Sequence, residues 1–206
     1  MASGYLKVEE IEYRGLTLEP WYSLSITNLE TVSMFSNMFK SWFAAASANY
    51  NEFIKALLNG DVKAMNLYMN DIALATFSNF DAGKHASERS QPERFYHGFV
   101  LGLIAERAED YEIRSNRESG FGRYDIMMIP KDIRKYPAII IEFKVCGRMK
   151  KETMEDAVQS ALKQIAEKNY DAELLSQGIP ADRIRHYGFA FEGKKVLIGT
   201  EPAVCL

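Results

Sequence analysis

The apolar stretch AIIIEFKV, residues 138–145, constrains the fold of this chain more than any other segment. A run of this length, rich in isoleucine, predicts a strand buried on both faces, as found at the centre of α/β sheets. Because side chains alternate along a strand, Glu142 and Lys144 share one face, opposite Ile141 and Phe143. Burial of an unpaired carboxylate or ammonium group is costly, so these two charges need each other, a metal ion or a ligand.

The preceding apolar run, RYDIMMI at residues 123–129, carries Asp125 in its middle. The loop PKDIRKYP that joins the two runs has a proline at each end, and a loop of this length suits neighbouring antiparallel strands. Neighbouring strands lie about 4.8 Å apart, which brings Asp125 close to Glu142. Two converging carboxylates repel each other unless a cation lies between them, and oxygen ligands favour hard ions such as Mg²⁺ or Mn²⁺.

A site of this kind suits metal-assisted hydrolysis of phosphodiesters. The metal neutralises charge on the phosphate and lowers the pKa of a bound water. Lys144, on the same face as Glu142, is expected either to orient and help deprotonate that water or to stabilise the developing negative charge. The competing interpretation is a structural ion pair between Glu142 and Lys144, with Asp125 as a turn residue.

The pattern of the chain changes class at a polar loop, DAGKHASERSQP, residues 81–92. Before this loop we predict short extended segments over residues 4–26, followed by three helices. The first begins after Asn28, the second spans 47–59, and the third begins after Asp61. After it we predict helix 93–108, strands 111–116, 123–129 and 138–145, helix 152–169, and strands 185–193 and 195–201. The chain is thus expected to hold an N-terminal layer of short strands and helices, residues 1–80, and an α/β core, residues 93–206.

Composition narrows the function classes. The net charge of −3 weakens the case for a generally basic nucleic-acid binder, although an acidic metal site and local basic patches remain compatible with it. Two cysteines, without paired Cys or His spacing, argue against a disulfide scaffold and a zinc site. We see neither a signal peptide nor an apolar run approaching the ~18 residues of a membrane span, and therefore expect a cytoplasmic protein.

The set Asp125, Glu142-x-Lys144 resembles the PD-(D/E)XK nuclease superfamily, whose restriction-endonuclease-like core is an α-β-β-β-α-β mixed sheet. More specifically, ERFYHGFVLGL, SNRESGFGRYDIMMIP and IIIEFKV together resemble the nuclease-like C-terminal domain of a large family of bacterial proteins. Those proteins usually carry an AAA-type ATPase-like domain at the N-terminus. The segments GYLKVEE and YSLSITNLETVSMF resemble the junction between the two parts, and the chain contains no P-loop motif.

The resemblance implies catalytic roles for Asp125, Glu142 and Lys144, with Mg²⁺ as the cofactor and Mn²⁺ as a substitute. Asp125 and Glu142 would hold the metal, and the main-chain carbonyl of Phe143 would add a ligand. Family members often add a glutamate from the first core helix, for which Glu93 is the candidate and Glu118 its competitor. Glu93 is equally well explained as an acid in the first turn of a helix.

Other polar residues near these strands are candidates for substrate binding. Gln164 and Tyr170 resemble a Gln and a Tyr that some of these nucleases place after the lysine, and Gln164 joins the predicted catalytic set. Their spacing of six residues separates them by about 120° on a continuous helix, unless the helix ends before Tyr170. Arg123 would bind phosphate or pair with Asp125. Basic residues on both sides of the site strands would either contact a nucleic-acid backbone or form an ordinary solvated surface. They are Lys131, Arg134, Lys135, Arg148, Lys150 and Lys151.

The leading hypothesis is a metal-dependent endo- or exodeoxyribonuclease that acts on DNA in preference to RNA. The alternative is a catalytically silent module that binds nucleic acid or protein within an ATPase-linked system. The expected partners are nucleic acid, an AAA-type ATPase domain or protein, and a second copy of the chain bound through the helices of residues 28–80.

Overall fold

The computed structural model describes residues 6–15, 18–28, 30–31, 34, 47–76, 91–119, 122–146 and 153–201. The chain forms two compact units, residues 1–45 and 46–206, which we describe separately. The predicted layer of residues 1–80 is therefore divided, because helices from its second half belong to the same compact unit as the sheet. Within the described residues, no helix combines the length and the apolar character needed to cross a membrane.

The first unit contains an antiparallel hairpin of β1, Leu6–Arg14, and β2, Glu19–Ile26. The predicted turn at Arg14 and Gly15 is present, and Gly15 has a positive φ of 74° that glycine adopts without strain. After the hairpin, Asn28 Oδ1 accepts a hydrogen bond from the Thr31 N–H at 2.8 Å, as expected of a helix N-cap. The predicted helix from Asn28 lies largely outside the described residues.

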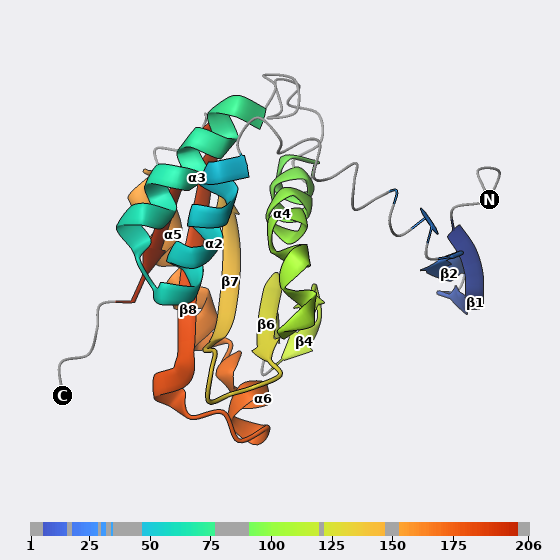
Figure 1. Ribbon diagram of the computed structural model, residues 1–206. Helices are drawn as coiled ribbons and strands as arrows, with labels where there is room; N and C mark the ends of the chain where they lie inside the picture. The colour runs from blue at the N-terminus through green and yellow to red at the C-terminus, as the bar shows by residue number, and fades with distance from the viewer. Residues whose placement is uncertain are drawn as a thin grey trace. The chain divides into compact units, whose positions relative to one another are not determined.

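The second unit contains a five-stranded mixed sheet in the order β3-β6-β7-β8-β9. Its strands are β3 Tyr111–Ser115, β6 Ile126–Pro130, β7 Ala138–Val145, β8 Ile184–Glu192 and β9 Lys195–Thr200. β7 and β8 are parallel, and the other neighbours are antiparallel. β7 is the predicted central strand, and Figure 1 shows it beside β8. The restriction-endonuclease-like mixed sheet expected from the sequence is confirmed.

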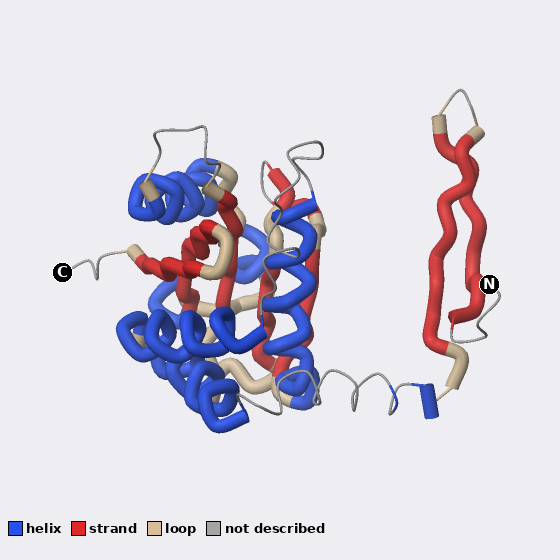
Figure 2. The backbone as a smooth tube through the Cα atoms, turned by 90° about the horizontal axis from the view of Figure 1, so that it is seen from above, coloured by secondary structure: helices blue, strands red, loops and turns tan. Residues whose placement is uncertain are grey.

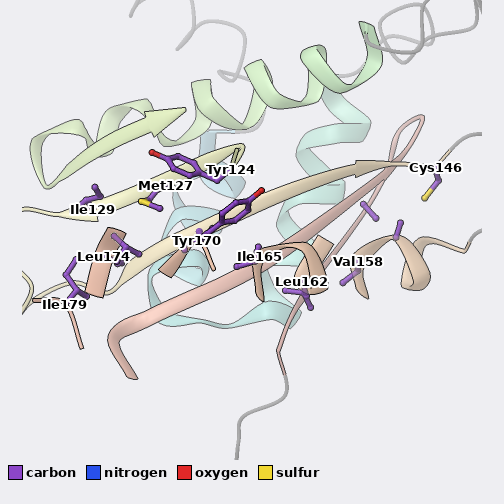
Figure 3. Packing of buried hydrophobic residues seen from close by; sticks show 14 residues of the cluster. Tyr124, Met127, Ile129, Cys146, Val158, Leu162, Ile165, Tyr170, Leu174 and Ile179 are labelled. Carbon is purple, nitrogen blue, oxygen red and sulfur yellow. The ribbon is translucent and has the colours of Figure 1, made fainter. Parts of the chain in front are cut away.

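Helices cover both faces of this sheet (Figure 2). They are α2 Ser47–Asn59, α3 Val62–Thr76, α4 Gln91–Ile104, α5 Met154–Glu167 and α6 Asp171–Ser176. On one face the Phe143 ring lies 5.5 Å from the His97 ring of α4. On the other face Ala138 and Ile140 belong to one buried cluster with Val158 and Leu162 of α5; Figure 3 labels the two α5 residues. Because Glu142 has the same strand parity as Ile140, its side chain belongs to the α5 face.

Gly188 of β8 allows α5 to lie close to the sheet. It is paired with Glu142 in the parallel register between β7 and β8. A Cβ at Gly188 would lie 2.7 Å from the Val158 carbonyl oxygen and 3.1 Å from the Ala161 Cβ. No real side chain tolerates the first distance, so the absence of a side chain here permits the close helix packing. The same contact brings the polar residues of α5 next to Glu142.

Two asparagines of α3 occupy the edge of the sheet. Asn66 donates to the Ile198 carbonyl and accepts from the Ile198 N–H, both at 2.8 Å. Asn70 forms the same pair with Val196, at 2.8 and 3.0 Å. Four residues of helix rise about 6.0 Å, and two residues of strand about 6.7 Å, so two side chains match two successive edge positions. The asparagines thus replace a sixth strand along β9.

Replacing Asn66 and Asn70 together by leucine is expected to destabilise the protein by about 4 kcal/mol. Four edge groups of β9 would lose their partners beneath a helix, and each buried group without a partner costs about 1–3 kcal/mol. Urea denaturation measures the change. Asn49→Leu is the control, because Asn49 makes a single exposed contact of 3.4 Å with Asp71. Equal losses in the double variant and the control would contradict this account.

Candidate metal and nuclease site

The centre of the site is the carboxylate of Glu142 in β7. The residue is 3% exposed. Its Oε1 lies 3.4 Å from the Lys144 Nζ, which confirms that the two charges share a face. Its Oε2 is also buried, and no residue in the described part of the chain forms a hydrogen bond with it. An ionised carboxylate in this position is only half satisfied, which favours a cation as the missing partner.

Asp125 reaches Glu142 by a different local structure from the one predicted. The predicted strand 123–129 is interrupted, with β5 at Gly122–Arg123 and β6 beginning at Ile126, so Asp125 lies between strands and not within one. The Asp125 carbonyl accepts from the Asn116 N–H at 2.9 Å. Ile126 is paired with Ile141, which places Asp125 beside Glu142 as the sequence predicted.

The Asp125 carboxylate is fixed by the backbone of β7. Its Oδ2 accepts the Phe143 N–H at 2.8 Å. The antiparallel pairing of β6 with β7 begins at Ile126 and Ile141, so the carboxylate takes up a β7 donor just beyond the paired segment. One oxygen of Asp125 is thereby held by the backbone of β7.

Burial raises the pKa of both carboxyl groups. For Glu142, burial and then the charge of Asp125 raise the pKa to about 8, against the opposing effect of Lys144. For Asp125, burial raises the pKa, and the Phe143 N–H and the charges of His97, Lys144 and Arg123 partly offset it. Two adjacent carboxyl groups that resist ionisation are a common sign of a functional site, and a divalent cation would favour the ionised form of both.

Gln164 of α5 connects the charged groups to each other. Its Oε1 accepts from Lys144 Nζ at 2.6 Å, and its Nε2 donates to Glu142 Oε1. The same Nε2 lies 3.2 Å from the Tyr170 hydroxyl, which donates to the Arg123 carbonyl at 2.6 Å. These contacts form one network from β7 through α5 to the backbone of β5.

The six-residue spacing of Gln164 and Tyr170 is accommodated because α5 ends at Glu167. Asn169 has a φ of +51°, a left-handed conformation that asparagine tolerates better than most residues. The chain turns back at this residue and brings the Tyr170 hydroxyl to the Gln164 amide. The predicted helix to residue 169 is therefore too long, and the expected 120° divergence does not arise.

A family model described as the PD-(D/E)XK nuclease superfamily matches residues 91–201. The chain belongs to this superfamily. The matched residues contain α4, the whole five-stranded sheet and α5, so the PD-(D/E)XK core and its nuclease-like function are the part of the sequence interpretation that is confirmed. A search of curated proteins found no relative that matches the chain.

The structure describes only part of the remaining residues that we predicted for the PD-(D/E)XK site. The backbone of Glu93 lies in α4 and that of Glu118 in β4, Glu118–Ser119, but both side chains are outside the described set, so the choice between them stays a prediction. Arg123 is exposed on β5. Within the described part of the chain, no three His, Cys, Asp or Glu side chains converge as a ready metal cage.

The predicted basic region divides into two parts. The loop carrying Lys131, Arg134 and Lys135 joins the end of β6 to the start of β7, whereas Asp125 precedes β6 and Lys144 is near the end of β7. Five residues of strand span about 17 Å, so this loop lies at the other end of the site strands and not beside the carboxylates. Lys131 there donates to the Ala108 carbonyl at 2.7 Å. Arg148, Lys150 and Lys151 lie outside the described residues.

Sequence reasoning missed the group that supports the backbone at Asp125. His97 Nε2 lies 2.8 Å from the Ser115 hydroxyl, and its Nδ1 lies 3.0 Å from the Asn116 side-chain amide. Asn116 has a φ of +54° and donates its N–H to Asp125. Asn116 at the end of the predicted strand 111–116 was the available signal, because asparagine is enriched in left-handed turns.

Proposed function

We propose that the PD-(D/E)XK core is a metal-dependent nuclease that hydrolyses phosphodiester bonds in DNA, with Mg²⁺ as the ion and Mn²⁺ as a substitute. The observation that carries the proposal is the buried Glu142 Oε2, which has no hydrogen-bond partner in the described chain and lies next to a second carboxylate. A half-satisfied carboxylate at 3% exposure has little value as a purely structural group.

Asp125 and Glu142 are the residues that would hold the ion. In an extended strand the N–H and C=O of one residue point to the same edge. Because the Phe143 N–H is directed to Asp125, the Phe143 carbonyl faces the same side, which supports its predicted role as a third ligand. A bound divalent cation supplies charge stabilisation at the phosphate and a more acidic water.

Lys144 is the residue we assign to the attacking water or to the developing negative charge. Its Nζ is held by Glu142 and Gln164 on the face of β7 that carries Glu142. Gln164 therefore orients Lys144 and Glu142 together, a role in positioning that is added to the predicted contact with substrate. Tyr170 is 1% exposed and bonds to the backbone of β5, which favours a positioning role over the predicted substrate contact.

The test is a cleavage assay with the full chain on duplex DNA, single-stranded DNA and RNA, each with Mg²⁺, Mn²⁺ or EDTA. We expect cleavage of DNA that requires the ion, and a loss of at least about 100-fold in Asp125→Asn, since one metal ligand would be weakened. Cleavage that persists equally in Asp125→Asn would show that the activity arises elsewhere. Absence of cleavage on every substrate would favour the catalytically silent module.

The biological setting remains a set of predictions that this proposal does not need. An AAA-type ATPase domain or partner, a homodimer formed through the helices of residues 28–80, bacterial origin and a cytoplasmic location all stay expectations from the sequence.

A further inference from the structure

Gly122 of β5 lies in close contact with the two residues Lys168 and Tyr170 that follow α5. A Cβ at this position would be 3.0 Å from the Lys168 Cγ and Cδ, and 3.2 Å from the Tyr170 hydroxyl oxygen. The next residue, Arg123, offers its carbonyl to that same hydroxyl. The aliphatic stem of Lys168 therefore lies across the backbone of β5, directly beside the hydrogen-bond network of the site.

The turn that positions Tyr170 also positions Lys168. The Lys168 N–H donates to the Gln164 carbonyl at 3.0 Å, which ends α5 one turn after the residue that holds Lys144 and Glu142. The left-handed Asn169 follows at once. The backbone of Lys168 is thus held by Gln164, and the stem of its side chain contacts Gly122.

The ammonium group of Lys168 lacks a carboxylate partner among the described residues. Lys168 is exposed, whereas the charge of the exposed Arg123 acts on Asp125. By contrast, Lys163 on the same helix pairs with Glu167 at 3.5 Å. A long cation that packs its stem on the protein and leaves its ammonium group in water is well placed to meet an anion.

We propose that Lys168 binds a phosphate of the substrate's sugar–phosphate backbone next to the one that is hydrolysed. The inference rests on the proposed function, because a nucleic-acid backbone is the anion that the site requires. Contacts of this kind set the position of the strand without reading its sequence. The absence of a side chain at Gly122 leaves room for the stem of the lysine at van der Waals distance from the backbone of β5.

Fluorescence anisotropy with a labelled DNA duplex and a labelled DNA single strand, in EDTA to prevent cleavage, tests the proposal on the full chain. We expect Lys168→Gln to weaken binding about fivefold at low salt. It should also lower the slope of log K against log salt by about 0.7–0.9, the value for one phosphate contact. Lys168→Arg should retain both values. Lys163→Gln is the matched control on the same helix and should change neither.

The outcomes separate this inference from the proposed function. If the wild-type chain cleaves DNA but Lys168→Gln has the affinity and salt slope of Lys163→Gln, the phosphate contact is wrong and the nuclease assignment stands. If the salt slope depends on Lys168 but no cleavage occurs with Mn²⁺, the contact stands and the nuclease assignment fails. Absence of binding to both probes would overturn the contact.

Discussion

Replacing Glu142 by glutamine is expected to stabilise the metal-free protein at pH 8 while it removes metal-dependent cleavage. Glu142 is 3% exposed, and burial together with the charge of Asp125 raises its pKa to about 8. The neutral amide keeps the shape of the side chain and an oxygen that accepts from Gln164 and Lys144. It also removes the negative charge, which is unfavourable in the metal-free interior. Because the cation would need that charge, metal binding is expected to be lost.

The direction of the pH dependence follows from the two pKa values. In the unfolded chain Glu142 ionises near its ordinary value of 4.5, and in the folded chain near 8. Between these values the folded state holds a proton that the unfolded state releases, so the free energy of unfolding falls as the pH rises. The stabilisation that comes from the protonated Glu142 is fully present below about pH 4.5 and is lost as the pH rises to about 8. Its size is on the order of a few kcal/mol.

Urea denaturation in EDTA at pH 5, 6.5 and 8 measures this effect. We expect wild-type stability to fall across the series by a few kcal/mol and Glu142→Gln to flatten the fall. Glu167→Gln is the control, because Glu167 is exposed on α5 and its partner is Lys163. If the stability of Glu142→Gln follows the same pH profile as wild type, ionisation of the buried Glu142 does not destabilise the protein as predicted.

Replacing Lys144 by alanine is expected to reduce DNA cleavage by roughly 10² to 10⁴-fold, the range for loss of a positioned proton-transfer group. The Lys144 Nζ lies 3.4 Å from Glu142 and 2.6 Å from Gln164, so its removal takes away a cation in contact with one of the proposed metal ligands. We expect the loss in kcat and only a small change in Mn²⁺ affinity, because neither carboxylate is altered.

Single-turnover cleavage with saturating Mn²⁺ separates the two effects. Lys163→Ala is the matched control, since Lys163 is a lysine of α5 that pairs with the exposed Glu167. Cleavage by Lys144→Ala at the rate of the Lys163→Ala control would remove Lys144 from the chemistry and leave only a structural ion pair.

The sequence was sufficient for the parts of the site that depend on strand alternation and on loop length. AIIIEFKV forms β7, Glu142 and Lys144 share a face, and the antiparallel neighbour brings Asp125 to Glu142. Each of these follows from a local rule, namely a period of two along a strand and a short connection between neighbours.

The sequence was insufficient where a single backbone conformation changed the geometry. Asp125 lies between β5 and β6 because Asn116 takes up its carbonyl, and no alternation of apolar residues signals that break. Gln164 and Tyr170 meet because Asn169 is left-handed, which a uniform helical period cannot express. The pairing of Asn66 and Asn70 with β9 joins segments far apart in the chain, so no local pattern predicts it.

The central claim is that Asp125 and Glu142 together bind a divalent cation. Calorimetric titration of Mn²⁺ into the full chain, Asp125→Asn and Glu142→Gln tests it most directly. We expect binding by the wild-type chain that is lost in both variants, since each carboxylate supplies one oxygen ligand of the ion. Absence of Mn²⁺ binding by the wild-type chain, or binding by either variant with the affinity of the wild-type chain, would contradict the claim.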